Sequence, residues 1–526
     1  MATRNVVQDT NGVDGEALYC KTESANYVRR EISGQANSLI AAGRQQPSSI
    51  APCCRDRVGC FSLATVCLYD EKAFVASKPR HSYGYKRTHL TSDAKRGNTA
   101  ATTFPRTTPL PRAVRGFWFW IVASAFITLC TTYYYRHFLH LYYYPFINPW
   151  FQPYSYQFDF NCYSERIKYF HQALFFHQSG AVFNYPAVLA LVYKLFYLFG
   201  RHAHTLFVST LISCFGIGAA LFARSLARHG VSIITASLFM FTVLVTSHPL
   251  GVLLYLANME GIVWIATSLG VYAFTKNRTW SAALCFGLAG AMKIFPIAYL
   301  GLLLQKRCYR QFSFGVVVCA VVNLVSLAVL GPTIRIAAHG LSEGIKGFSR
   351  VYVYQWNPLE SSMDHSLFAL FKVILVAAGR LDLLRIAAGP YLYLVAIGGL
   401  VLYFAVLRTL PTINAVLALA IACVLFPQVS HDYTLVHLYA PWALLILALL
   451  NGGLSSASEK GARYMMGCFI ILFTSQNYLI VNDVRFAGQI KAIVLVILLI
   501  LAIRYPLRSE FDVGIEGVRT RASLPR

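Results

Sequence analysis

Long apolar runs alternate with short polar segments along most of the chain, from about residue 116 to residue 503. A helix needs about 20 apolar residues to cross the hydrocarbon core of a bilayer. Helices satisfy their own backbone hydrogen bonds in lipid, and no strand-like alternation accompanies these runs. The pattern therefore predicts an all-α, polytopic transmembrane bundle of about 11–13 membrane segments with long extracytoplasmic loops. The candidate runs lie at roughly 116–134, 186–199, 204–223, 231–247, 251–274, 280–304, 313–331, 366–378, 386–407, 411–427, 434–450, 463–481 and 488–503.

Basic residues near the ends of these runs predict the orientation of the chain, because cytoplasmic loops are enriched in Lys and Arg. Arg106, Arg112 and Arg115 precede the first run, which places the N-terminus in the cytoplasm. The segment 135–180 then lies outside, and it is too long for a simple hairpin.

The later loops extend this prediction. A basic cluster at 306–310 returns the chain to the cytoplasm, loop 332–364 lies outside, and the basic tail after Arg504 lies inside. Two cytoplasmic termini require an even number of crossings. The candidate runs number 13, which is odd, so at least one of them is predicted to be re-entrant or interfacial. The short runs 186–199 and 366–378 are the candidates for this role.

The polar ends of the chain divide it into three parts. Residues 1–112 are rich in Ser, Thr and Arg and lack sustained periodicity, which predicts a disordered, basic cytoplasmic arm. The first residues are polar, so no signal peptide is predicted. Residues 113–508 form the predicted membrane domain, and 509–526 a cytoplasmic tail.

Composition supports a membrane protein and argues against a nucleic-acid partner. Charged residues make up 13% of the chain, whereas soluble domains average about 25%. Lys and Arg number 46 against 22 Asp and Glu, but the basic residues gather at helix ends and in the arm. The 13 cysteines are scattered without paired CxxC motifs, so neither a disulfide framework nor a zinc site is predicted.

Asp159 is the leading candidate for a catalytic group. It lies in an aromatic loop, between Phe158 and Phe160, within the first long outer segment. Apolar neighbours raise the pKa of a carboxylate and make it a better base. The alternative is an ordinary helix N-cap aspartate.

A stretch after this aspartate, Cys162–Phe176, has apolar residues at helical spacing: Ile167, Phe170 and Leu174. The spacing predicts a helix lying on the outer membrane surface. Glu165 falls within it and is expected on a solvated face.

Ionisable residues interrupt several apolar runs. Asn258 and Glu260 fall within one run, and a carboxylate inside a membrane is a candidate functional group, although a place at the membrane boundary would also explain it. Lys293 lies mid-run, three residues before Pro296, which predicts a broken helix or a water-filled cavity. An unpaired ammonium there would bind an anion such as a phosphate, whereas a lysine at a helix end would simply reach toward the interface.

The second outer loop and a later polar break add further candidates. Arg350 is a cation in loop 332–364, and Ser430, His431 and Asp432 separate two apolar runs. Adjacent His and Asp residues rarely point together in a helix, so this pair is weak evidence for a triad. No phosphate-binding loop, GxGxxG, HExxH or GxSxG motif stands in a suitable context, which disfavours ATP-driven transport and metalloproteolysis.

Taken together, the motifs resemble the bacterial polyprenol-phosphate-mannose-dependent mannosyltransferase family, within the membrane glycosyltransferase superfamily C. They are also similar to the mannosyltransferases of glycolipid anchor synthesis. The resemblance covers about residues 116–450. It rests on Asp159-Phe160, Asn184-Tyr185-Pro186, Asn258-Met259-Glu260-Gly261, Ala289-Gly290 with Lys293-Ile294-Phe295-Pro296, Asp364-His365-Ser366-Leu367, and Pro427 to Tyr433.

The sequence departs from the family pattern at three places. Ala187 follows Pro186 where the family commonly has a second proline, and Asp364-His365 stand where it has Asn-Gln. His431 and Tyr433 flank the acid in a motif that is commonly Ser-Trp-Asp/Glu-His. These changes do not alter the expected fold. They affect the residues expected to determine which donor and which acceptor the protein uses.

The resemblance implies an inverting glycosyltransferase that moves a sugar, mannose or similar, from a polyprenyl-phosphate donor to an extracytoplasmic lipid or glycan acceptor. It implies an integral, multi-pass protein of the plasma membrane, here a bacterial inner membrane. Asp159 would be the base, and Lys293 and Arg350 would stabilise the leaving phosphate. The donor- and acceptor-binding residues would be Tyr185, Asn258, Glu260, Lys293, Arg350, Asp364, His365, Ser430, His431 and Asp432.

Other interpretations remain open at this point. A transporter or lipid flippase explains the membrane segments and the intramembrane Glu260 and Lys293 equally well, but not Asp159 with the long outer loops. A scaffold that has lost activity is compatible with the departures at 364–365 and 431–433. No cofactor is expected, and a divalent metal, although compatible with the reaction, is not indicated because no paired metal-binding carboxylates are evident.

Overall fold

The computed structural model describes residues 108–138, 158–177, 182–356, 362–452, 454–476, 480–481 and 484–508. All of them belong to one compact unit of the chain, and the second unit, Thr22–Pro105, lies outside the described residues. The predicted arm as far as residue 107 and the predicted tail at 509–526 also lie outside them.

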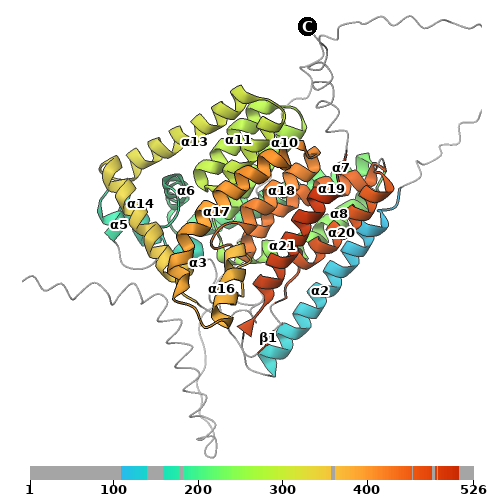
Figure 1. Ribbon diagram of the computed structural model, residues 1–526, viewed down its shortest axis with the longest axis horizontal. Coiled ribbons are helices and arrows are strands. Elements are labelled where there is room, and N and C mark those ends of the chain that lie inside the picture. Colours follow the sequence, from blue (N-terminus) through green and yellow to red (C-terminus); the bar gives the residue numbers. More distant parts are fainter. Residues whose placement is uncertain are drawn as a thin grey trace, which may run out of the picture. The chain divides into compact units, whose positions relative to one another are not determined.

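The regular secondary structure of the described residues is helical, apart from a hairpin of two two-residue antiparallel strands and one isolated β-bridge. The predicted all-α, polytopic membrane bundle is confirmed (Figure 1). The elements are α2 (Arg112–His137), α3 (Phe158–Asn161), α4 (Ser164–Lys168), α5 (Leu174–His177), α6 (Ala187–Tyr197), η1 (Gly200–His202), α7 (Ala203–Arg228), α8 (Ile233–Thr246), α9 (His248–Leu256), α10 (Glu260–Thr275), α11 (Thr279–Met292), η2 (Phe295–Leu300), α12 (Gly301–Gln305), α13 (Tyr309–Leu330), α14 (Ile334–Phe348), η3 (Ser349–Val353), α16 (Leu367–Ala377), α17 (Leu383–Ala405), η4 (Leu407–Thr409), α18 (Thr412–Leu425), η5 (Asp432–Leu438), α19 (Tyr439–Leu450), α20 (Ser456–Phe473), β1 (Ile480–Val481), β2 (Val484–Arg485) and α21 (Ala487–Arg504).

Six helical segments of the described chain are long and apolar enough to cross a membrane, and the bent pair α8–α9 makes a seventh if it is one span. The two halves of that pair meet at 55°. Five shorter apolar helices accompany them, including α6 and α16, which correspond to the short runs at 186–199 and 366–378. These two have 11 residues each, about 17 Å of helix against a hydrocarbon core of about 30 Å.

Two helices end inside the membrane domain, and the breaks that follow them place polar residues in its interior. α9 ends at Leu256, and Ala257 takes a left-handed conformation (φ 49°) just before Asn258. α11 ends at Met292, and Lys293 is extended before Pro296 opens η2. The helix break predicted at Lys293 is confirmed. Backbone that leaves the helix at membrane depth is tolerated only where protein or a water-filled cavity surrounds it.

A large apolar core joins the N-terminal helix to the C-terminal ones. In Figure 1, α2 lies beside α20, and the two helices are in contact. Phe117 of α2 packs against Phe239 of α8, Trp442 of α19 and Phe473 of α20, with ring centroids 5.3–6.4 Å apart. This packing ties the predicted first span to the last part of the chain.

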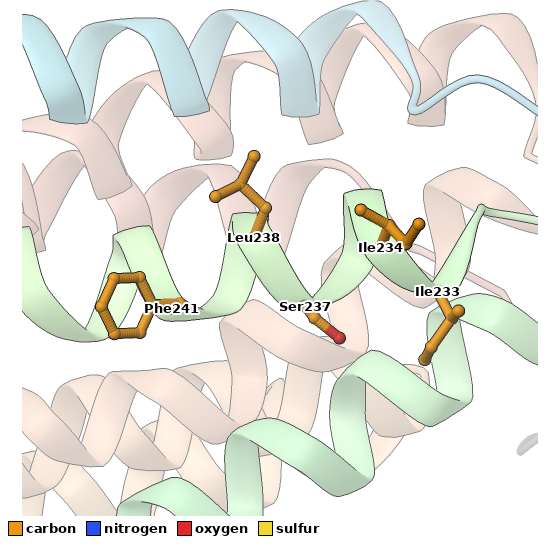
Figure 2. Close-up of a pocket in the computed structure, with 5 residues that line it drawn as sticks. All are labelled: Ile233, Ile234, Ser237, Leu238 and Phe241. Atoms are coloured by element: carbon orange, nitrogen blue, oxygen red, sulfur yellow. The ribbon is translucent and has the colours of Figure 1, made fainter.

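The outward faces of the helices are apolar, as a lipid-facing surface requires. Figure 2 shows a shallow recess along α8 in which Ser237 is the one polar residue. The recess contains none of the candidate site residues. Its other lining residues are Ile233, Ile234, Leu238 and Phe241.

The single amphipathic helix predicted over 162–176 is wrong. The chain forms two short helices, α4 and α5, and His171 between them has a positive φ of 75°. The amide of His171 donates to the Leu330 carbonyl at the end of α13, 3.1 Å away. Ile167 and Phe175 are buried in a core cluster rather than spread over a membrane surface. Periodicity alone does not reveal such a turn, because it is fixed by a contact to a distant helix.

Candidate functional site

Asp159 lies in the one-turn helix α3, and aromatic side chains fix its backbone. The Tyr193 hydroxyl donates to the Asp159 carbonyl at 3.2 Å, and the Tyr197 hydroxyl donates to the Phe160 carbonyl at 2.8 Å. The fully buried Phe160 ring stacks on Tyr197 and on Phe207, with centroids 5.0 and 4.8 Å apart. These aromatic side chains therefore fix the backbone from which the Asp159 side chain projects.

The Asp159 carboxylate meets the broken segment between α9 and α10. Asn258 Nδ2 donates to Asp159 Oδ2 at 2.7 Å and also lies 3.2 Å from the hydroxyl of Tyr185. Burial raises the pKa of Asp159 to about 6, while the hydrogen bond from Asn258 and the charge of Lys293 oppose the rise. A carboxylate with a raised pKa is suited to accept a proton near neutral pH.

Tyr185 lies in the segment before α6, and this segment packs closely against α14. The Tyr163 hydroxyl donates to Asn184 Oδ1 at 3.0 Å. Gly344 of α14 lies so near the preceding backbone that a Cβ there would stand 2.0 Å from the Phe183 carbonyl oxygen. Only glycine permits that approach.

The same broken segment also carries a carboxylate that contacts a lysine and a histidine. Glu260 is buried, its amide donates to Asn258 Oδ1 at 2.8 Å, and its Oε2 pairs with Lys293. Its Oε1 lies 2.6 Å from His437 Nε2 of η5. The expectation of an unpaired Lys293 is therefore wrong, because Glu260 neutralises it. The Lys293 side chain nevertheless keeps 30% of its surface exposed.

Asp364 and His365 are buried, and their side chains contact other parts of the protein. Asp364 Oδ1 accepts hydrogen bonds from the amides of Ser366 and Ser430, at 3.0 and 2.9 Å. His365 Nε2 lies 3.2 Å from the Ser430 hydroxyl. Asp364 also forms a backbone bridge with His431, so these contacts join the loop before α16 to the loop before η5.

Asp432 is likewise buried, in a charged cluster that the sequence did not predict. Lys491 Nζ of α21 is 2.7 Å from its Oδ1, and His248 Nε2 of α9 is 2.9 Å from its Oδ2. The side chains of Asp432 and Lys491 are fully buried. This carboxylate therefore anchors the start of η5 to α9 and α21.

Two further predicted residues have other neighbours. Arg350 is exposed in η3, where its charge acts on Glu343 of α14. The centroid of the His431 ring lies 6.3 Å from that of Tyr352 and 5.8 Å from that of Tyr433. The structure thus brings together Asp159, Tyr185, Asn258, Glu260 and Lys293 as one connected group.

Sequence reasoning missed three residues of these clusters: His248, His437 and Lys491. All three are ionisable side chains within or next to apolar runs, which is the pattern that marked Glu260 and Lys293. Glu165, by contrast, is where it was expected, 69% exposed and paired with Lys168 at 2.6 Å. Within the described ranges, no group of three or more His, Cys, Asp or Glu side chains could hold a metal ion.

Comparison with models of protein families gives a match. The family model of glycosyltransferase family 87 matches residues 183–430, which include four of the five connected site residues. No curated protein matches the chain. The family match confirms the resemblance drawn from the sequence motifs.

Proposed function

We propose, from the match of residues 183–430 to glycosyltransferase family 87, that this membrane glycosyltransferase uses a polyprenyl-phosphate sugar as donor. The sugar is mannose or a similar hexose, and the acceptor is an extracytoplasmic lipid or glycan. The observation that carries the proposal is the group at Asn258 and Glu260. It holds Asp159, with its raised pKa, close to the half-buried cation Lys293.

The reaction requires one proton transfer and one displacement. Asp159 accepts the proton of the acceptor hydroxyl, and that oxygen attacks the anomeric carbon of the donor sugar. The bond between the anomeric carbon and the phosphate oxygen breaks, and polyprenyl phosphate leaves with the bonding electrons. Attack from the face opposite the phosphate inverts the anomeric configuration.

The exposure of each site residue indicates whether it contacts a substrate or holds other residues in place. Tyr185 and Lys293 are half-buried and contact the substrates, with Lys293 stabilising the charge that develops on the phosphate. Asn258 and Glu260 are buried and hold these groups in place. Asp364, His365, Ser430 and Asp432 hold the loops around the site.

A transfer assay with the purified protein tests the proposal. Liposomes containing the protein receive a panel of polyprenyl-phosphate sugars and a mixed glycolipid acceptor fraction. We expect sugar transfer with inversion from at least one donor. Movement of the lipid-linked sugar across the bilayer without transfer would instead identify a transporter or flippase.

We predict that the loop carrying Asp159 is extracytoplasmic in a plasma membrane, with a cytoplasmic N-terminus. Gln172→Cys, at an exposed position of this loop, is expected to react with a membrane-impermeant thiol reagent from outside. Arg307→Cys, in the basic loop after α12, is the matched control and is expected to react only from the cytoplasmic face. Both are made in a background without reactive native cysteines. The reverse labelling pattern would place the site on the cytoplasmic side.

We predict that Lys293→Met weakens use of the donor by roughly 2–5 kcal/mol, as removal of one partner of a buried charge pair does. The loss is measured as kcat/KM for the polyprenyl-phosphate donor. The change also removes the lysine partner of Glu260 and so disturbs the packing around that carboxylate. The double variant Lys293→Met, Glu260→Gln, in which both partners are replaced, is the control for that disturbance. Donor kinetics like those of the wild type in a folded Lys293→Met protein would remove Lys293 from the phosphate site.

A further inference from the structure

Tyr433 of η5 differs from the other tyrosines around Asp159. Four of their hydroxyls are hydrogen-bonded within the protein, namely those of Tyr163, Tyr185, Tyr193 and Tyr197. Tyr433 is half-buried, and its hydroxyl forms no hydrogen bond with any residue that the structure describes. It is also not one of the described buried polar atoms that lack a partner, so solvent reaches it. This hydroxyl is therefore available to a ligand.

The backbone on both sides of Tyr433 is held in place. Asp432 is fully buried, with Lys491 Nζ 2.7 Å from its Oδ1. Thr434 is buried as well, and its amide donates to the His431 carbonyl at 2.8 Å. The Tyr433 ring itself packs against the main apolar core. The hydroxyl thus has a defined position although it bonds nothing there, and a ligand that binds it pays little to order the side chain.

The Tyr433 hydroxyl lies within electrostatic range of the Asp159 centre. The strongest influences on it come from Tyr185 and then Asp159, and Glu260 acts more weakly. None of these three side chains is hydrogen-bonded to it. Polar groups that face one another beyond hydrogen-bond distance are bridged by a water or by a polar group of a ligand.

We propose that Tyr433 binds a hydroxyl of the acceptor sugar, beside the hydroxyl whose proton Asp159 accepts. This inference rests on the proposed function for its ligand. A phenol both donates and accepts a hydrogen bond, as a sugar hydroxyl does. The acceptor is therefore a glycan or glycolipid whose terminal ring carries a second hydroxyl near the reacting one, and not a lipid with a single alcohol.

The neighbours of Tyr433 favour the acceptor over the donor. Tyr185 and Asp159, which act on its hydroxyl most strongly, lie on the side of the base, and the base receives its proton from the acceptor. The leaving phosphate belongs to the side of Lys293 in the proposed reaction. A neutral phenol also lacks the charge that stabilises a phosphate.

Tyr433 is one of the places at which this chain departs from the pattern of its family, which commonly has a histidine there. Tyrosine places a hydroxyl at the end of a longer side chain, whereas histidine presents ring nitrogens closer to the backbone. The acceptor preference that Tyr433 confers is therefore expected to be particular to this chain.

Saturation-transfer NMR with methyl mannoside, methyl glucoside and methyl galactoside tests the inference on the protein in nanodiscs, without any donor. We expect the wild type to bind at least one of them. Tyr433→Phe is expected to bind it about 3- to 10-fold more weakly, the usual effect of one neutral hydrogen bond. Equal affinity in the two proteins, or no binding of any of the three by the wild type, would overturn the inference.

Monodeoxy forms of the bound hexoside identify the hydroxyl concerned. The difference between the wild type and Tyr433→Phe is expected to disappear for the form that lacks the hydroxyl bound by Tyr433, because two changes that remove one contact are not additive. The same difference for every monodeoxy form would mean that the Tyr433 hydroxyl contacts none of them.

Tyr403→Phe is the matched control. The hydroxyl of Tyr403 on α17 donates to the Gly301 carbonyl at 2.7 Å, so its removal breaks a contact within the protein. We expect Tyr403→Phe to lower the unfolding temperature and to leave hexoside binding unchanged, and Tyr433→Phe to do the reverse. A fall in unfolding temperature for Tyr433→Phe as large as that for Tyr403→Phe would make its hydroxyl a structural group and overturn the inference.

Kinetics in the transfer assay distinguish the two substrates. Tyr433→Phe is expected to lower kcat/KM for the glycolipid acceptor about 3- to 10-fold and to leave KM for the polyprenyl-phosphate donor unchanged. An effect confined to the donor would overturn the assignment to the acceptor. Absence of transfer from every donor would refute the proposed function, while the NMR result would still decide whether Tyr433 binds a sugar hydroxyl.

Discussion

Asp159→Asn is expected to insert into the membrane, bind the donor and transfer sugar about 10²–10⁴-fold more slowly than the wild type, the usual cost of losing a general base. The asparagine keeps an oxygen that can accept the hydrogen bond from Asn258, so the contact at 2.7 Å survives while the base is lost. The measurement is the single-turnover rate of transfer, with donor binding determined separately.

The pH dependence of the wild type provides a second readout of the same group. Burial raises the pKa of Asp159 to about 6, so the carboxylate becomes protonated and unable to accept a proton as the pH falls through that value. Transfer should therefore decline on the acid side near pH 6, and the Asp159→Asn variant should lack this limb. Glu165→Gln is the matched control, because Glu165 is an exposed acid of the same loop paired with Lys168. Near-normal transfer by Asp159→Asn would mean that the base lies elsewhere.

Lys491→Met is expected to destabilise the protein by about 3–5 kcal/mol, the cost of removing one partner of a buried ion pair. Lys491 and Asp432 are both fully buried and 2.7 Å apart. The change leaves the carboxylate with two histidines, His248 at 2.9 Å from Oδ2 and His365 at 3.7 Å from Oδ1. The effect is measured as a fall in the unfolding temperature of the detergent-solubilised protein.

Two further variants test the cause of that loss. Lys491→Met combined with Asp432→Asn removes both charges and is expected to recover most of the stability. Arg463→Met breaks the exposed pair between Arg463 and Glu459, and it is expected to change stability by less than about 1 kcal/mol. Equal unfolding temperatures for Lys491→Met and Arg463→Met would show that the buried pair contributes nothing.

The apolar runs predicted the helices well, because a membrane restricts the chain to one kind of spanning structure. Every candidate run contains at least one helix of the structure, and the proline at 296 correctly indicated the break after Met292. The turn at His171 was missed because it depends on a hydrogen bond to Leu330, more than 150 residues along the chain.

The partners of the charged residues could not be predicted for the same reason. Lys293 was expected to need an external anion, but Glu260 reaches it across 33 residues of sequence. His437 and Lys491 carried the same signal as Lys293, an ionisable side chain in an apolar run, yet only the folded chain shows which acid each one meets. The burial of Asp364 and Asp432 was not predicted either, since burial cannot be read from a motif.

The segment from Asn258 to Glu260 has a mechanical consequence. Its first residue bonds Asp159, its last bonds Lys293, and the amide of Glu260 closes back on Asn258 Oδ1. The spacing of the acid and the cation is thus set by a three-residue span of backbone rather than by how two helices pack. When a bilayer thins or thickens, helices tilt and slide past one another. A centre built on one short loop keeps its internal dimensions through such changes, so its chemistry is insulated from the thickness of the surrounding membrane.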